Sequence, residues 1–120
     1  MNIKHQQKIA FGMIVLNGDY VLEECLNSVY DFASQILIAE GPVKYWQERG
    51  ITTSTDKTNY ILDNFSDPKN KIKIIHSQYD EKDSQCNAYM ENLNNDIDYI
   101  WNLDCDEIYK QGDLEKIDKL

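Results

Sequence analysis

The segment Lys8–Leu16 is a nearly continuous run of apolar residues with the length of one β-strand. An apolar run without polar alternation is typical of an interior strand of a parallel sheet, which is covered on both faces. Parallel neighbours must be joined by long crossover connections, which are usually helices. This one segment therefore favours an α/β fold, and it requires helices and further strands in the rest of the chain.

The sequence after this run alternates between helical and strand patterns. Asn17-Gly18-Asp19 forms a turn, and the apolar residues of 21–30 then recur at the spacing of one helix face. Further strands are predicted at Gln35–Ala39, Lys71–His76 and 97–103, and further helices at Thr58–Phe65, from Asp83 or Ser84 to about Asn95, and at Gly112–Leu120. Strands that alternate with helices predict βαβ units. The expected fold is therefore a mostly parallel, open sheet with helices on both faces.

The sequence pattern also predicts four local details. The apolar part of 97–103 predicts a buried strand, and the polar segment around Trp46 and Gly50 predicts a functional loop. In the helix that starts near Asp83, the residues expected to face the core are Cys86, Tyr89, Met90 and Leu93. His76 is expected to end its strand without a catalytic part.

Length and charge limit the class of protein. The 120 residues fit one domain, 1–120, with Met1–Gln7 expected to be frayed. The formal net charge of −9 argues against a nucleic acid or an anionic membrane as the main partner, and no apolar run is long enough for a membrane span. Cys25, Cys86 and Cys105 match no zinc spacing, so we expect thiols in a reducing compartment and a cytoplasmic protein.

The stretch Tyr99–Tyr109 passes from apolar residues into a cluster of carboxylates. Because side chains alternate along a strand, Asp104 and Asp106 are predicted to share one side. Two neighbouring carboxylates repel each other unless a cation joins them, and Mg²⁺ or Mn²⁺ prefers such oxygen ligands. The stretch therefore predicts a metal and phosphate site, with a solvated loop as the alternative. A calcium-binding loop is excluded because Tyr109 stands where the required glycine should be.

Polar residues follow three of the predicted strands. These groups are Asn17-Gly18-Asp19, Glu40-Gly41-Pro42 and Asp104–Glu107. The carboxyl ends of parallel strands lie at one edge of a sheet, where ligands of open α/β sheets bind. We therefore expect these groups to form one site.

Several motifs in this order resemble the nucleotide-binding half of family 2-type glycosyltransferases with the GT-A fold. The matching segments are Ile9–Asn17, Tyr20–Val29, Ile36–Pro42, Ser54–Thr58, Asn87-Ala88-Tyr89 and the Asp-x-Asp-Glu of Asp104–Glu107. They cover nearly all of Lys8–Tyr109. Two positions depart from the family's pattern, because Lys57 replaces a usual glycine and Cys86 replaces an arginine that is often found before Asn87.

The resemblance implies a binding site for a nucleotide-diphosphate sugar, such as a UDP- or GDP-sugar, with Mn²⁺ or Mg²⁺ as cofactor. The implied nucleotide-sugar contacts are Asn17, Glu40, Asp56, Asn87 and Asp104, and the implied metal ligands are Asp106 and Asp104. Among these, Glu40 stands where an acidic group contacts the base or the ribose, and Asp106 is the better metal ligand.

The family's acceptor-binding half and its catalytic base follow the Asp-x-Asp region, so no catalytic base is assigned in this chain. We expect a glycosyltransferase-like domain that binds its donor and transfers little or no sugar to its acceptor, which is unknown. The alternative is a non-catalytic doubly wound module that binds a nucleotide or a metal or has a regulatory role. A flavodoxin-like receiver of this kind would carry its acidic cluster after the first strand. The sequence leaves the oligomeric state open between a monomer and a homo-oligomer.

Overall fold

Four parallel strands form one sheet in the order β3-β2-β1-β4. The computed structural model describes residues 7–103. Its elements, in chain order, are β1 (Ile9–Val15), α1 (Leu22–Val29), β2 (Gln35–Glu40), α2 (Lys44–Gln47), α3 (Thr58–Asn64), β3 (Ile72–His76), α4 (Lys82–Met90) and β4 (Tyr99–Asn102). The strand alternation predicted from the sequence is confirmed.

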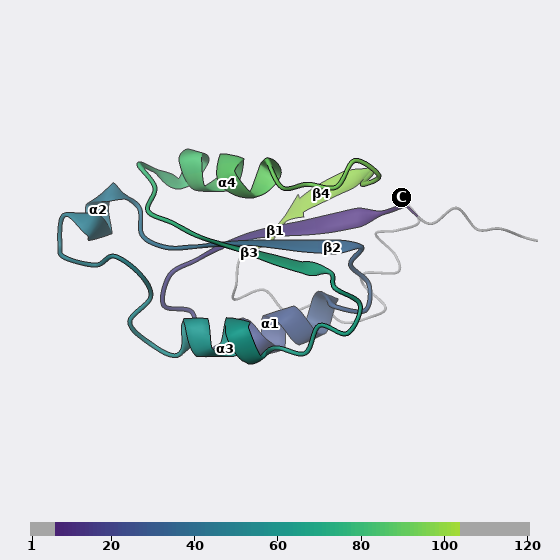
Figure 1. Cartoon of the computed structure of the whole chain (residues 1–120), viewed down its shortest axis with the longest axis horizontal. Coiled ribbons are helices and arrows are strands. Elements are labelled where there is room, and N and C mark those ends of the chain that lie inside the picture. The colour runs from purple at the N-terminus through teal and green to yellow at the C-terminus, as the bar shows by residue number, and fades with distance from the viewer. Residues whose placement is uncertain (1–6, 104–120) are drawn as a thin grey trace, which may run out of the picture.

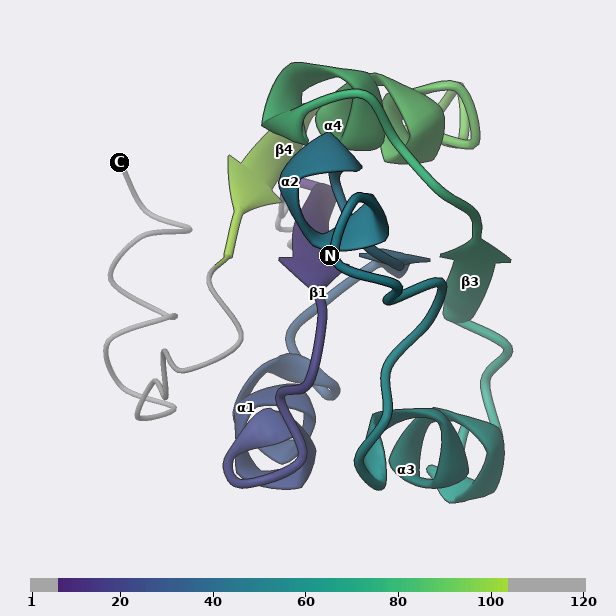
Figure 2. The ribbon, with the colours of Figure 1, turned by 90° about the vertical axis from the view of Figure 1, so that its left-hand side faces the viewer.

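The helices cover the sheet from two sides and give the molecule three layers. Helices α1 and α3 lie side by side under the sheet, and α4 lies above it (Figure 1). The short helix α2 lies beyond the carboxyl ends of the strands, as the view along the sheet shows (Figure 2). This arrangement confirms the predicted α/β fold with helices on both faces.

The main core lies between the sheet and the lower pair of helices. Alternate residues of β1 and β2 face it, among them Phe11, Met13 and Ile38, and all three are almost completely buried. Helix α1 contributes its whole apolar stripe, in which Leu22, Cys25, Leu26 and Val29 have no exposed surface. The helical period of the sequence predicted this stripe correctly.

The upper layer is thinner and is organised around Tyr89 of α4. Its ring lies so close to β1 that a β-carbon added at Gly12 would stand 2.2 Å from the tyrosine Cε1 atom. The Tyr89 hydroxyl donates a hydrogen bond to the side-chain oxygen of Asn102 on β4. Gln85, one turn earlier, is buried and donates to the backbone carbonyls of Ala39 and Gly41, at 2.8 and 3.2 Å. These contacts attach α4 to β1, β2 and β4.

Three details of the prediction are wrong. Strand β4 is an edge strand of the described sheet and not a buried one, and its Tyr99 is 56% exposed because only β1 lies beside it. Met90 is exposed, since the face of α4 toward the sheet carries Gln85 and Tyr89, which are one helical turn apart. The segment predicted as a loop includes helix α2, which buries no side chain. The predicted helix Gly112–Leu120 lies outside the described residues.

Candidate nucleotide-binding edge

Strands β1, β2 and β3 end in one row. Val15 pairs with Glu40, and Glu40 pairs with His76. The backbone amide of Gly41 then donates to the Val15 carbonyl, and that of Ser77 to the Glu40 carbonyl. Because side chains alternate along strands, Glu40 and His76 project from the same face of the sheet, the face that α1 and α3 cover. The structure therefore brings the end of the predicted site strand β2 next to a histidine.

The carboxylate of Glu40 is buried, with 1% of the residue exposed, and both of its oxygens accept hydrogen bonds. Oε2 accepts from the Ser54 backbone amide at 2.7 Å. Oε1 lies 2.8 Å from Nδ1 of His76, and the Thr53 hydroxyl reaches both oxygens at 3.1 and 3.2 Å. A buried carboxylate is tolerated only when it is paired in this way.

The environment of Glu40 favours its ionised form. Burial by itself would raise the pKa of the carboxyl group, but hydrogen bonds from His76, Ser54 and Thr53 outweigh it and hold the pKa below its usual value. An ionised carboxylate can only accept hydrogen bonds, so the facing Nδ1 of His76 carries a proton. Nδ1 is therefore occupied by Glu40, and the ring nitrogen left for another partner is Nε2.

The turn after β1 is joined to the segment that precedes α3. Asn17 adopts a left-handed conformation with φ of 54°, which asparagine tolerates better than most residues. Its side-chain oxygen accepts from the amides of Thr55 and Asp56, at 2.7 and 3.3 Å, and its own amide donates to the Ser54 hydroxyl at 3.0 Å. Two of the predicted site residues, Asn17 and Asp56, are therefore in direct contact.

A second set of hydrogen bonds continues this connection. The Gly18 amide donates to the Thr58 hydroxyl at 2.8 Å, and the Asp19 amide donates to a carboxylate oxygen of Asp56 at 3.1 Å. Asp19 in turn accepts from the Lys57 amide at 3.1 Å. Burial would raise the pKa of Asp56, but hydrogen bonds from Thr58 and Asp19 outweigh it, so the pKa lies below its usual value. The turn after β1 and the start of α3 thus form one unit.

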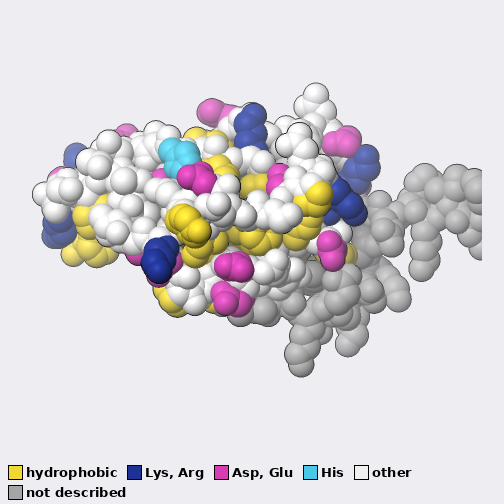
Figure 3. Space-filling model, turned by 60° about the horizontal axis from the view of Figure 1, so that its bottom comes forward, with side chains coloured by type: hydrophobic (Ala, Val, Ile, Leu, Met, Phe, Trp, Pro, Cys, Tyr) yellow, Lys and Arg dark blue, Asp and Glu magenta, His cyan; other side chains and the backbone are white. Residues whose placement is uncertain are grey.

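A hollow of about 380 Å³ opens at the ends of β2 and β3. Its walls are Glu40, Thr52, Thr53, His76, Ser77 and Gln78. The His76 side chain is 49% exposed, whereas that of Glu40 beneath it is 1% exposed. In the space-filling view, a histidine reaches the surface near acidic side chains (Figure 3). The hollow is within the size range of small-molecule sites, and each residue of its walls has a polar side chain.

Two other predicted features lie apart from this hollow. Asn87 is exposed on α4, and none of the site contacts described above involves it. Asp104 and Asp106 lie outside the described residues, although Leu103, the residue before Asp104, is buried and its amide donates to the Gly12 carbonyl. Residues 7–103 contain no group of three or more His, Cys, Asp or Glu that could hold a metal ion. The predicted metal site therefore stays a prediction.

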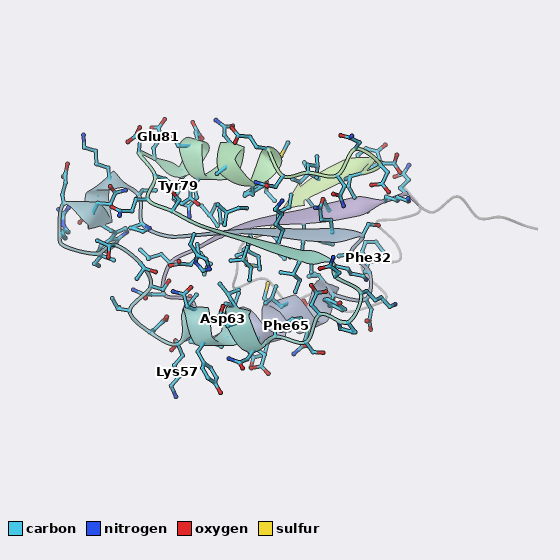
Figure 4. All side chains as sticks on the ribbon, in the orientation of Figure 1. Phe32, Lys57, Asp63, Phe65, Tyr79 and Glu81 are labelled. Atoms are coloured by element: carbon cyan, nitrogen blue, oxygen red, sulfur yellow. The ribbon has the colours of Figure 1, made fainter. Side chains whose placement is uncertain are left out.

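A larger hollow of about 520 Å³ lies between α1 and α3, with Tyr30, Tyr60 and Phe65 among its walls. Figure 4 shows Phe65 below the sheet and Lys57 at the beginning of α3. None of the predicted site residues lines this hollow, and it lies under the sheet and not at the strand ends. We therefore place the candidate site at the smaller hollow.

His76 is the site residue that the sequence analysis missed. Its position as the last residue of β3 is the same as that of Glu40 in β2, and this equivalence was the available signal. The signal was weak, because the register of two strands is not visible in a sequence before they are paired.

Comparison with known proteins supports this interpretation of the edge. The model of the family described as "Glycosyl transferase family 2" matches residues 52–119, which is more than half of the chain. The chain belongs to glycosyl transferase family 2. The match begins in the wall of the hollow at Thr52 and continues through α3, β3, α4 and β4. No curated protein matches the chain in sequence.

Solved structures extend the likeness to the first two strands. Staphylococcus aureus TarS 1–349 superposes with a TM-score of 0.64 at 18% identity, covering 92% of this chain and 31% of TarS 1–349. The complex of the same TarS fragment with UDP gives a TM-score of 0.61 at the same identity and coverage. A further TarS structure gives 0.62 at 18% identity, with 92% of this chain and 19% of TarS covered. The chain spans about a third or less of these proteins. The likeness confirms the GT-A-type α/β fold.

No helix within residues 7–103 has both the length and the apolar character needed to cross a membrane.

Proposed function

We propose that this chain binds the nucleotide-diphosphate sugar of a glycosyltransferase, with a UDP- or GDP-sugar as donor. The observation that carries the proposal is the polar hollow at the carboxyl ends of β2 and β3, in a chain that belongs to glycosyl transferase family 2. Ligands of open α/β sheets bind at this edge. The complex of TarS with UDP supports the proposal, because TarS has a similar fold.

In this proposal the nucleoside lies at the Glu40 hollow and the diphosphate lies toward the turn after β1. Asn17 and Asp56 hold this turn in place through the contacts described above, so the two residues shape the binding edge. Asp104 and Asp106, which follow β4 in the sequence, would be the ligands of Mn²⁺ or Mg²⁺. When bound there, the cation would supply Lewis-acid stabilisation to the leaving diphosphate.

The proposal is tested by calorimetric titration of the chain with UDP, GDP and their sugars, in Mn²⁺ and in EDTA. We expect one of the two nucleotide families to bind in Mn²⁺ and to bind at least about tenfold more weakly in EDTA. Asp106→Asn keeps the shape of the side chain but removes its charge, and it should weaken binding in Mn²⁺ by about tenfold or more. Asp63→Asn, an exposed change on α3 (Figure 4), is the matched control and should bind like the unchanged chain.

Two results would contradict the proposal in different ways. Equal affinity in Mn²⁺ and in EDTA would remove the metal from the proposal and leave the nucleotide. Absence of binding by every nucleotide and nucleotide sugar, in a chain whose thermal unfolding remains cooperative, would reject donor binding itself.

A further inference from the structure

Two loops continue side by side beyond the carboxyl ends of β2 and β3, and the second of them forms part of the wall of the hollow. The Tyr79 amide donates to the Pro42 carbonyl at 3.0 Å. Gly41 has a φ of 142°, and a β-carbon added there would stand 1.8 Å from the Ser77 carbonyl oxygen. The loop after β2 is therefore in close contact with the loop that contributes Ser77 and Gln78 to the hollow.

Two glutamine side chains bind the carbonyl groups of this region. Gln85 of α4 is 3% exposed, and its Nε2 donates to the carbonyls of Ala39 and Gly41, at 2.8 and 3.2 Å. Gln47 of α2 joins both loops, because its Nε2 donates to one carbonyl of each, at 2.9 and 2.6 Å. The beginning of α4, where Figure 4 labels Glu81, lies at the same end of the sheet as α2. A buried carbonyl without a donor is unfavourable, so the two amides stabilise the observed paths of the loops.

A third glutamine makes the same kind of contact at the opposite end of the sheet. Gln35, the first residue of β2, is 5% exposed. Its Nε2 donates to the Asn92 carbonyl at 3.2 Å, and its Oε1 accepts from the Asn94 amide at 2.9 Å. Gln35 and Gln85 therefore both connect β2 with α4 or with the residues just after it, and their burial is similar. They differ in that only Gln85 lies at the end of the sheet with the proposed donor site.

We infer that Gln85 and Gln47 are positioning residues of the donor site, which keep the loops after β2 and β3 in the shape that binds the nucleotide, whereas Gln35 contributes to stability alone. This inference rests on the proposed function, since it names further residues on which the same site depends. Neither Gln85 nor Gln47 is among the walls of the hollow, so each acts through the backbone. Gln85 does so from the face of the sheet opposite to the Glu40 side chain.

Loss of a positioning amide should act on the fraction of molecules whose binding edge has the right shape. When the loops exchange rapidly between several paths, the nucleotide binds only the fraction with the observed path, and the apparent affinity falls by that fraction. The association rate constant falls by the same factor, whereas the dissociation rate constant of the bound complex stays the same. Loss of a residue with only a structural role would reduce the free energy of unfolding without changing either rate constant.

The experiment compares Gln85→Leu, Gln47→Leu and Gln35→Leu, which each keep the approximate size of the side chain and remove its amide. Calorimetry with UDP and GDP in Mn²⁺ gives the affinity, and stopped-flow measurements with fluorescently labelled UDP and GDP give the two rate constants. We expect Gln85→Leu to lower the affinity and the association rate constant about tenfold, as for residues that orient binding groups without touching the ligand. Gln47→Leu should give a smaller loss in the same direction, and Gln35→Leu, the matched control, should bind like the unchanged chain.

Chemical denaturation of the three variants separates binding from stability. Gln85→Leu and Gln35→Leu each remove a buried amide that contacts two backbone groups, so they should lose similar free energies of unfolding. A difference between them in nucleotide binding is then not a consequence of stability. If Gln85→Leu does not fold, Gln47→Leu decides the question, because Gln47 is only partly buried and belongs to a helix that buries no side chain.

The outcomes separate this inference from the proposed function. If Gln85→Leu, or Gln47→Leu in its place, binds UDP or GDP as the unchanged chain does, the inference is wrong and the proposed function stands. The inference is also wrong if Gln35→Leu loses as much affinity as Gln85→Leu, or if the lost affinity appears only in the dissociation rate constant. If no nucleotide binds to the unchanged chain, both proposals fail.

Discussion

Helix α1 packs under the sheet through four side chains without exposed surface, whereas α4 packs above it mainly through one glutamine and one tyrosine. The four residues of α1 are all apolar and follow the helical period. The contact of α4 depends instead on the close approach of Tyr89 to Gly12 and on two hydrogen bonds from Gln85 to backbone carbonyls at the carboxyl end of β2. One helix is held by burial of apolar area, and the other by specific geometry.

The difference between the packing of α1 and that of α4 indicates which contacts tolerate substitution. Apolar packing is roughly proportional to buried area, so similar side chains can replace one another at moderate cost. A contact made by a glycine or a buried amide has few acceptable substitutes, because a missing atom leaves a polar group unpaired and an added atom collides. The lower layer should therefore respond to lost volume, and the upper layer to changed shape.

The largest expected effect is the loss of volume in the lower layer. Leu26→Ala removes a completely buried side chain and should reduce the free energy of unfolding by about 2–5 kcal/mol. Leu93→Ala makes the same change in the upper layer, where the leucine is only partly buried, and should cost clearly less. Chemical denaturation of both variants provides the measurement. Equal losses would show that the two layers do not differ in this respect.

A smaller effect is expected from added volume in the upper layer. Gly12→Ala places a β-carbon against the Tyr89 ring and should cost about 1–3 kcal/mol, because the ring must move. The companion variant Tyr89→Leu removes the ring, and in that background the same glycine change should cost much less. Denaturation of the two single variants and the double variant gives the coupling energy. Additive costs would show that the ring is not the obstacle.

The smallest expected effect concerns acid stability at the end of the lower layer. Burial would raise the pKa of Asp67, but hydrogen bonds from Tyr30 and from the Ile72 and Lys71 amides outweigh it, so the pKa lies below 3.8. The unfolded chain therefore takes up this proton first as the pH falls. The stabilisation is complete above about pH 3.8 and is lost as the pH falls through the lower, folded pKa.

Asp67→Asn should make the acid-side decrease in stability shallower, by no more than about 1 kcal/mol because the site is partly solvated. Tyr30→Phe keeps the ring but removes the hydroxyl that donates to Asp67 at 2.5 Å, and it should give part of the same change. The measurement is the midpoint of thermal unfolding between pH 7 and pH 2. An unchanged slope in Asp67→Asn would contradict this assignment.

The sequence predicted those parts of the fold that depend on periodic burial. The apolar runs of β1 and β2 and the stripe of α1 each leave a regular pattern, and the structure confirms all three. The burial pattern led to wrong predictions where the structure of a segment depends on residues that are distant in the sequence. Tyr99 of β4 looked buried because its neighbours are apolar, but its exposure depends on what lies beyond the sheet edge. Helix α2 depends on Gln47, which donates to the Pro42 and Tyr79 carbonyls.

For the candidate site, the sequence predicted which strand ends lie close together, but not the individual side-chain contacts. Parallel strands place their carboxyl ends at one edge, so the proximity of Asn17 to the strand end at Glu40 followed from topology. The contact between Asn17 and Asp56 did not, because it depends on a single left-handed residue and on the path of the chain before α3. The role of His76 required the register of β2 and β3. Asp104 and Asp106 lie outside the described residues, so their metal site remains a prediction.

The hydrogen bonds between the turn after β1 and the start of α3 have a consequence for the rate of binding. They are made entirely between protein groups, with Asn17 and Asp19 on one side and Thr55, Asp56 and Lys57 on the other. A binding edge that is already ordered loses little conformational entropy when a ligand arrives. Association should therefore be a single fast step that is limited by the encounter itself, and differences in affinity between nucleotides should appear as differences in the time for which each one stays bound.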